Sequence, residues 1–454
     1  MAIKHDTALT TGPITKSLIL FALPMMAGNL LQQLYNVADT IIVGRFLGAD
    51  TLAAVGSAYT LMTFLTSILL GLCMGSGALF SIRWGEGDRS GLKSGIFHAF
   101  VFIASVTTVL NIAVFLLLNP ILVLLQVPHG IIPLMHTYLW CIFWGIPAVF
   151  LYNYFAALLR AVGNSVVPLV FLGISAILNI ALDLTFVLIC GWGVAGAAIA
   201  TVIAQYVSGI GIAVYTLIRL PVLVPAKEDC HWSRRVLGEI VSFSLLTCVQ
   251  QSIMNFGILM VQGLVNSFGE VVMAAFAAAV KIDSFAYMPV QDFGNAFSTF
   301  IAQNYGARSQ ERIRKGTRSA VICAAVFCVA VSAVVCLFAA PLMGIFVDPT
   351  DPAVAQITAV GVQYLWIEGA CYCGIGILFL LYGFYRAVRR PAMSVVLTVF
   401  SLGTRVALAY ALAPQVGVWG IWISVPIGWA LADLVGAVYY FRRRAALLPE
   451  SSSF

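Results

Sequence analysis

Long apolar stretches separated by short polar segments recur along the whole chain. Most of them reach the roughly 20 residues that a helix needs to cross the hydrocarbon layer of a bilayer. The pattern predicts an all-α polytopic membrane protein with twelve transmembrane helices. These lie near residues 16–38, 51–80, 94–118, 133–158, 165–189, 194–218, 236–262, 271–301, 317–339, 357–384, 392–412 and 416–441.

The composition agrees with this pattern. Of the 454 residues, 61% are hydrophobic and only 9% are charged, whereas soluble domains average about 25% charged residues. The first apolar stretch is too long for the apolar region of a signal peptide, and no small-residue cleavage site follows it. It therefore predicts a first transmembrane helix.

The basic residues fall on one side of the predicted topology. Of 24 Lys and Arg residues, all but Arg45, Lys281 and Arg405 lie in the termini or in loops that follow even-numbered helices. Because cytoplasmic loops carry an excess of cations, this distribution predicts two cytoplasmic termini. The net charge of +6 is then a topology signal, and no nucleic-acid partner is expected.

The first six predicted helices resemble the last six. Residues 75–95 match residues 296–316 at an offset of 221, and residues 160–162 match residues 386–388 at an offset of 226. Six is an even number, so both halves enter the membrane in the same direction, which defines a parallel repeat. The predicted organisation is an N-terminal tail (1–15), a first lobe (16–219), a cytoplasmic linker (220–235), a second lobe (236–441) and a C-terminal tail (442–454).

Two equivalent bundles around a central cleft suit alternating access, in which one bundle rocks against the other. The alternative is a scaffold whose duplication has no mechanical role. No P-loop, nucleophile motif or metal-spaced Cys/His set is present, so neither an enzyme nor a cofactor is expected.

Acidic residues inside the predicted helices are the strongest functional signal. A charge at the centre of a bilayer helix costs about 2.5–3.5 kcal/mol, and such residues usually mark ion or proton pathways. Six acidic side chains lie within or at the edge of the spans: Asp39, Asp183, Asp283, Asp292, Glu368 and Asp433.

In the first lobe, Asn179 and Asp183 are four residues apart and share one helix face. Together with Asp39 they form an oxygen-rich set without a basic partner in the neighbouring spans. Two carboxylates that are desolvated together cannot both ionise cheaply, so the set is expected to hold a proton or a cation such as Na⁺. The alternative is that these acids only pack or cap helices, and Asp39 by itself suits the outer interface equally well.

The second lobe differs, because Arg405 stands where the first lobe has Asn179. Arg405 and Lys281 are expected to be buried, and an Arg405–Glu368 or a Lys281–Asp283 pair is expected, since opposite charges in lipid usually pair. Gln250 is polar enough to line a cleft, although glutamines also join helices.

Pro24 precedes Asp39 in the same predicted helix and makes a kink or hinge possible there. Gln32 and Tyr35 of that helix and Met26 beside Pro24 are candidates for the lining of a substrate cleft, together with Gln250 and Glu368. Aromatic and methionine side chains in membranes are more often simple packing.

The stretches LPMMAGNLLQQLYNVADTIIVGRFLG (23–48), RAVGNSVVP (160–168) and NIALDLTFVLICGWGVAGAAIATVIAQ (179–205) resemble the multidrug and toxic compound extrusion (MATE) family. The similarity covers essentially the whole chain and is greatest for the DinF-like branch. It implies an antiporter that exports amphiphilic, often cationic, compounds in exchange for H⁺ or Na⁺.

The resemblance also implies site residues. The coupling ion is expected at Asp39, Tyr138, Asn179, Asp183 and Thr201, and the bending proline of the first helix falls on Pro24. The NorM-like branch places an acid on the seventh helix, but this chain reads CVQQSIMN there. Glu368 is a partial match to the second-lobe acids of that branch.

The main hypothesis is therefore an ion-coupled multidrug exporter in the cytoplasmic membrane of a prokaryote. It is expected to act as a monomer on small amphiphilic or cationic drugs. The alternative is a flippase for lipid-linked precursors in the same wider superfamily. Diphosphate lipids call for several cations facing the cleft, and only Lys281 and Arg405 are candidates.

Overall fold

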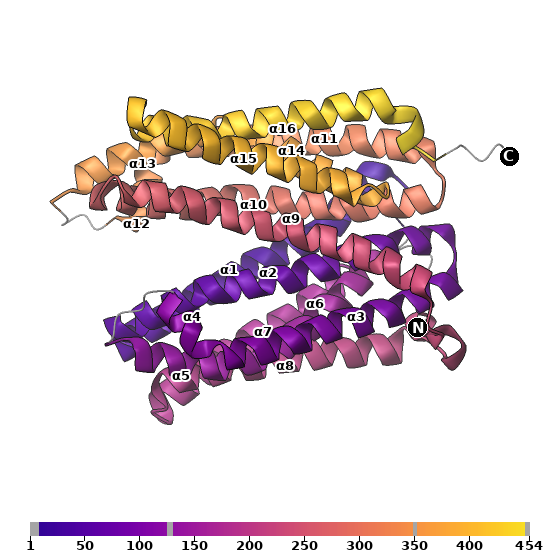
Figure 1. Cartoon of the computed structure of the whole chain (residues 1–454), viewed down its shortest axis with the longest axis horizontal. Coiled ribbons are helices and arrows are strands. Elements are labelled where there is room, and N and C mark those ends of the chain that lie inside the picture. Colours follow the sequence, from indigo (N-terminus) through magenta and orange to yellow (C-terminus); the bar gives the residue numbers. More distant parts are fainter. Residues whose placement is uncertain (1–8, 125–129, 348–351, 450–454) are drawn as a thin grey trace. The chain divides into compact units, whose positions relative to one another are not determined.

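A computed structural model describes residues 9–124, 130–347 and 352–449, so the outer ends of both predicted tails lie outside the described residues. Every regular element in these ranges is helical (Figure 1). The helices of the first half are α1 (Ile14–Leu47), α2 (Ala49–Glu86), α3 (Arg89–Leu116), α4 (Leu118–Leu124), α5 (Ile132–Ile142), α6 (Ile146–Ala161), α7 (Val166–Leu184) and α8 (Gly193–Arg219). Those of the second half are α9 (Arg234–Asn266), α10 (Glu270–Gly306), α11 (Gln310–Leu337), α12 (Ala339–Phe346), α13 (Val354–Gly369), α14 (Tyr372–Ala387), α15 (Pro391–Val416) and α16 (Val418–Leu447).

Among the described residues, eleven helical segments are long and apolar enough to cross a membrane. The pair α13 and α14, bent by 51° at the break, brings the total to as many as twelve. The predicted all-α membrane fold is confirmed. The main difference from the predicted spans concerns α1, which continues to Leu47, so Asp39 lies inside the helix and not at its end.

Two predicted spans are broken helices. A 3₁₀ turn at Phe143–Gly145 separates α5 from α6, and Pro147 at the start of α6 has no amide to continue the α5 ladder. Asn111 of α3 donates a hydrogen bond to the Phe143 carbonyl at 2.7 Å, which satisfies an acceptor that the break exposes. Pro147 and Asn111 therefore stabilise the break between α5 and α6.

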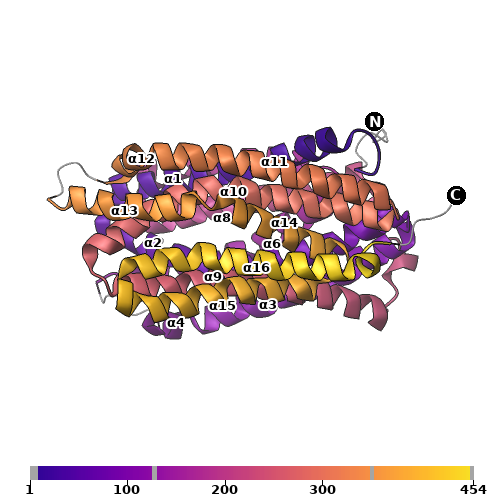
Figure 2. The same cartoon turned by 90° about the horizontal axis from the view of Figure 1, so that it is seen from above.

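The chain forms two compact units, and the divisions between them fall inside helices. The first unit contains Ala27–Cys248, and the second contains Leu9–Met26 together with residues 249–449. The first half of α1 therefore packs with helices of the second unit, and the first half of α9 packs with helices of the first. The long helices run nearly alongside one another within each unit (Figure 2).

In the first unit, α2 holds the first half of α9 at close range. Gly75 allows this approach, because a Cβ at Gly75 would collide with the backbone of Phe243. The Ser76 and Ser244 hydroxyl groups are 2.7 Å apart, and Arg83 forms an ion pair with Glu239 at 2.7 Å.

In the second unit, Arg312 of α11 holds the segment that leads into α1. Its guanidinium donates to the carbonyl oxygens of Leu9, Thr11 and Gly12 at 2.9–3.1 Å and to Asn304 Oδ1 at 3.0 Å. The Leu9 amide donates to Gln303 Oε1 at 3.1 Å. One planar donor group thus ties three carbonyl oxygens of the N-terminal segment to α10 and α11.

The internal repeat recurs in the backbone. Residues with positive φ occupy matching positions in the two halves, which is the conformation that glycine adopts at least cost. In two of the four pairs the second half has an arginine in place of glycine. The pairs are Gly48 and Gly269, Gly87 and Arg308, Gly163 and Arg389, and Gly193 and Gly417.

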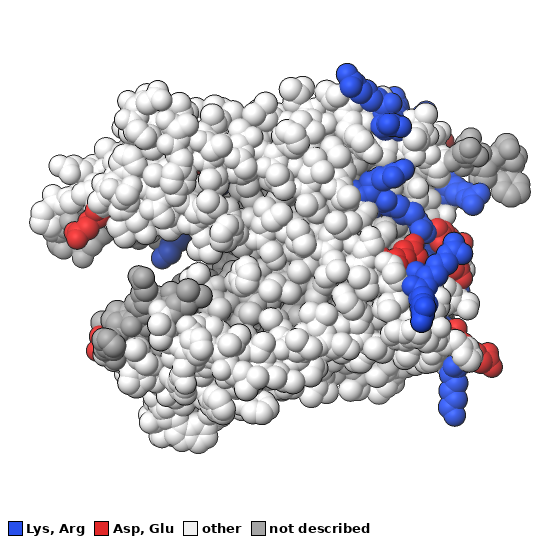
Figure 3. All heavy atoms as spheres, in the orientation of Figure 1, with Lys and Arg blue, Asp and Glu red and all other residues white. Residues whose placement is uncertain are grey.

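The visible basic side chains are unevenly distributed along the helices. Figure 3 shows most of the visible Lys and Arg side chains at one end of the helices, while the apolar middle of each unit carries almost none. This distribution is the one expected for helices whose apolar length lies in lipid.

We predict that Gly87→Ala lowers the free energy of unfolding by about 1–2 kcal/mol, because alanine at φ 73° brings its Cβ close to a carbonyl oxygen. Space is not the limitation, since a Cβ at Gly87 meets no atom within 4 Å. The thermal unfolding midpoint of the purified protein in detergent measures the effect. Gly56→Ala is the control, because Gly56 has similar open space but ordinary helical geometry, and alanine is expected to stabilise it by about 1 kcal/mol. Equal shifts of the two variants would contradict the prediction.

We predict that Arg312→Gln increases amide hydrogen exchange of residues 9–12 by about 10-fold, because glutamine cannot reach the four acceptors together. Hydrogen-exchange mass spectrometry of the N-terminal peptide measures the change. Arg318→Gln, on the same helix, removes the same charge and is expected to leave exchange of this peptide unaltered.

Candidate functional site

The proposed ion site lies in the first unit, where α1 and α7 bring two acidic residues together. Asp39 lies in the second half of α1, and Asp183 lies in the last turn of α7. A π-helical turn at Thr185–Ile189 follows α7 directly, and the Cys190 amide donates to the Thr185 carbonyl at 2.9 Å. Such turns are rare and occur often at functional sites.

The carboxyl groups of Asp39 and Asp183 lie within hydrogen-bonding range of each other. Asp183 is fully buried and Asp39 is half-buried. Both oxygens of Asp183 and Oδ1 of Asp39 are buried and accept no hydrogen bond from any residue that the structure describes. Two carboxylates this close repel each other, so the pair requires a shared proton or a bound cation.

Asn179 adds a third source of acceptor oxygen. Its Nδ2 donates to Thr201 Oγ1 of α8 at 3.2 Å, and the Thr201 hydroxyl donates to the Ala197 carbonyl at 3.1 Å. These two hydrogen bonds fix the side-chain amide of Asn179. Its Oδ1 is buried and has no donor among the described residues. Asn179 therefore presents an acceptor on the same helix face as Asp183.

Tyr138 of α5 is buried and lies close enough to interact electrostatically with both Asp39 and Asp183. It lies one turn before the end of α5 at Ile142. The structure thus brings together all five residues for which the sequence predicted ion binding. The shared property of the cluster is an excess of buried acceptor oxygens over donors.

This chemistry suits a proton or a hard cation. Carboxylate and amide oxygens are ligands for ions such as Na⁺, whereas zinc and other transition metals prefer imidazole and thiolate. No group of three His, Cys, Asp or Glu residues among the described residues is arranged to hold a metal ion.

The cleft candidates on α1 are spread along the helix. Gln32 is exposed, and its side chain lies within hydrogen-bonding range of the half-buried Tyr35. Met26 and Pro24 are half-buried and belong to the part of α1 that packs in the second unit. The helix continues through Pro24 without interruption.

The second unit contains an acid cluster that the sequence analysis described incorrectly. Tyr364 donates to Glu368 Oε2 at 2.9 Å and to Asp283 Oδ2 at 3.4 Å. The expected pairs Arg405–Glu368 and Lys281–Asp283 are absent from the ion pairs of the described residues. Lys281 is also exposed, not buried.

The Tyr364 hydroxyl group contacts both acids where cations were expected. Arg405 still lies close enough to Asp283 and Glu368 for an electrostatic interaction with each. Tyr364 precedes Glu368 by four residues, a spacing that could have identified this pair in the sequence. The remaining cleft candidate, Gln250, is buried in α9 directly after the division between the units.

Comparison with known proteins assigns the family. The chain matches the family model described as MatE over residues 24–185 and 246–411. The probable multidrug resistance protein YpnP of Bacillus subtilis is 30% identical over 435 residues, which cover 95% of this chain and 96% of that protein. The probable multidrug resistance protein NorM of Thermotoga maritima is 27% identical over 438 residues, with 93% and 90% covered.

The fold gives the same result. A solved structure described as MATE in the bent conformation matches with a TM-score of 0.91 at 24% identity, and the match covers 98% of each chain. The chain therefore belongs to the MatE family, the multidrug and toxic compound extrusion transporters, and it is a multi-pass membrane transporter and not an enzyme.

Proposed function

We propose that the chain exports amphiphilic, often cationic, compounds in exchange for H⁺ or Na⁺, and that the coupling ion binds at Asp39, Asn179 and Asp183. The observation that carries this proposal is the set of buried acceptor oxygens on these three residues, which have no donor among the described residues. The names of two relatives, both probable multidrug resistance proteins, support the substrate class.

The coupling mechanism follows from the charge of the cluster. When the carboxyl pair holds a proton or Na⁺, the repulsion between Asp39 and Asp183 is removed. When the ion leaves, Asp39 of α1 and Asp183 of α7 both carry a negative charge in a buried site and repel each other. The ion-bound and ion-free sites therefore favour different positions of α1 relative to α7. A transport cycle requires such a difference, because an ion shifts a conformational equilibrium only if it binds one conformation more tightly than the other.

Alternating access requires a movement that α1 and α9 must follow. Because each of these helices contributes its halves to different units, a rearrangement of the units must bend or rotate the helices near residues 26 and 248. Pro24 lies two residues before the division in α1 and removes a backbone hydrogen bond there. We assign the hinge of a rocker-switch movement to this position.

The remaining assignments follow from topology. The chain is assigned to the cytoplasmic membrane of a prokaryote, as a monomer. Both termini are assigned to the cytoplasm, because most basic residues lie in the termini or in the loops that follow even-numbered transmembrane helices. Gln32, Tyr35, Met26, Gln250 and Glu368 are assigned to the substrate cleft. The lobes are assigned to residues 16–219 and 236–441, and the acids of the first lobe favour the DinF-like branch.

The flippase alternative has less support. A flippase requires cations that bind the lipid diphosphate. Arg405 lies near the acidic residues Asp283 and Glu368, which offset its positive charge. Lys281 would be the remaining cation. Translocation of a lipid diphosphate without an ion gradient would favour this alternative.

We predict that Asp39→Asn and Asp183→Asn each reduce gradient-driven efflux of a cationic dye by about 10-fold or more, because an amide cannot exchange a proton or neutralise Na⁺. Proteoliposomes under separately imposed pH and Na⁺ gradients measure the effect. Asp50→Asn is the control, because Asp50 is an exposed acid at the start of α2. Full efflux by both site variants would refute the ion site, and absence of dye transport by the wild type under either gradient would refute the exporter.

We predict that Thr201→Val raises the Na⁺ concentration for half-maximal transport several-fold, about 5-fold, and leaves pH-driven transport within about 2-fold. Valine keeps the shape but removes the acceptor that fixes Asn179, whereas a proton is carried by the carboxyl groups. Thr185→Val is the control, since the Thr185 hydroxyl donates only to the Ala181 carbonyl of its own helix. Equal losses under both gradients would contradict a distinct role for Thr201.

A further inference from the structure

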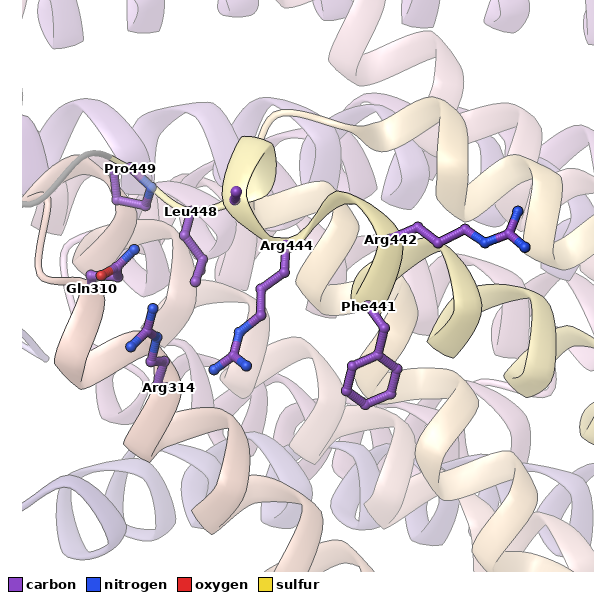
Figure 4. Close-up of a pocket in the computed structure, with 8 residues that line it drawn as sticks. Gln310, Arg314, Phe441, Arg442, Arg444, Leu448 and Pro449 are labelled. Atoms are coloured by element: carbon purple, nitrogen blue, oxygen red, sulfur yellow. The ribbon is translucent and has the colours of Figure 1, made fainter.

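A basic pocket lies in the second unit, away from both acid clusters. It has a volume of about 630 Å³ and lies between the amino end of α11 and the carboxyl end of α16 (Figure 4). Its lining includes Gln310 and Arg314 of α11, Arg442 and Arg444 of α16, and Phe441 beside them. Nothing in the proposed transport cycle uses this pocket.

The pocket carries positive charge without a described counter-charge. Figure 4 shows the side chain of Arg444 extending from α16 toward the α11 segment that carries Arg314. Neither arginine forms an ion pair with any acid that the structure describes. Glu311, the acid in the first turn of α11, is engaged with Lys315 at 2.6 Å. The two exposed guanidinium groups therefore leave positive charge at the pocket that a bound anion can neutralise.

We propose that this pocket binds the phosphodiester headgroup of an anionic phospholipid. Guanidinium groups bind phosphate oxygens through two parallel hydrogen bonds, so Arg314 and Arg444 can hold one phosphate from two helices. The amino end of α11 adds the positive end of a 28-residue helix at Gln310. Among the residues that the structure describes, the pocket lining offers no carboxylate for the ammonium group of a zwitterionic lipid.

An apolar stripe next to the pocket favours a lipid over a soluble phosphate. Leu434, Val438 and Phe441 follow one another at helical spacing on α16 and are 59%, 42% and 72% exposed. The stripe runs from the pocket toward the middle of a membrane-spanning helix. An acyl chain attached to a headgroup in the pocket can lie along these side chains, whereas a free phosphate gains nothing from them.

A less specific explanation exists for the arginines, because cations near a helix carboxyl end favour its dipole and set the membrane topology. Arg443 separates the two explanations. It lies between Arg442 and Arg444 in the same turn and is equally charged and exposed, but it does not line the pocket.

The test uses the purified full-length chain in detergent with phosphatidylglycerol, phosphatidylcholine or glycerol 3-phosphate as probes. Native mass spectrometry counts bound lipid, and the thermal unfolding midpoint reports stabilisation by binding. We expect phosphatidylglycerol to bind and to raise the midpoint. Phosphatidylcholine has the same phosphodiester but adds a trimethylammonium cation, which the arginines of the pocket repel, so we expect it to bind at least about 10-fold more weakly. Arg314→Gln and Arg444→Gln are expected to lose this difference, and Arg443→Gln is expected to keep it.

Several results would overturn the proposal. Equal binding of phosphatidylcholine would show that the headgroup charge is not recognised. An equal loss in Arg443→Gln would show a diffuse charge effect and no pocket, and competition by millimolar glycerol 3-phosphate would assign the pocket to a soluble phosphate. Because all three arginines are exposed, the variants are expected to fold, and their unfolding midpoints without lipid check this directly.

Discussion

The two helices that belong to both compact units constrain everything else in this transporter. A continuous α-helix keeps its backbone hydrogen bonds only if it bends at a weak point or moves as a whole. In α1 the weak point, Pro24, lies next to the division between the units, and Asp39 lies farther along the same helix. In the proposed mechanism, the charge of the ion site and the shape of the helix are thus properties of one element, and ion occupancy acts on conformation through α1.

The side chains that hold α1 and α9 in place differ between the two units, although the backbone fold repeats. Arg83 of α2 holds the first half of α9 through an ion pair with Glu239, whereas Arg312 of α11 holds the segment before α1 through backbone carbonyl oxygens. The acid clusters differ in the same way. Asn179 of the first unit corresponds to Arg405 of the second. The first cluster has more buried acceptor oxygens than donors, whereas the second contains a cation and the Tyr364 hydroxyl group. The repeat preserved the backbone and changed the polar chemistry.

The sequence predicted the helical membrane fold well, because apolar length and charge distribution are local signals. It also singled out Asp39, Asn179 and Asp183 as candidates for ion binding, since a polar group within an apolar stretch is conspicuous. It failed where pairing depends on geometry. Opposite charges suggested an Arg405–Glu368 pair, but the helix spacing of Tyr364 and Glu368 decides the actual partner. The contact of Arg312 with Leu9 spans 303 residues and has no local signal at all.

The N-terminal segment belongs to the second compact unit, and this has a practical consequence for measurements of conformational change. Residues 9–26 and 249–449 belong to the same compact unit, although they lie at opposite ends of the chain. In the proposed rocking movement, a pair of spectroscopic labels placed near residues 14 and 447 would therefore report motion within one body and stay nearly silent. A label near the start of α1 and another on α7 would instead follow the change between bodies, so the choice of reporter positions cannot be made from the order of the sequence.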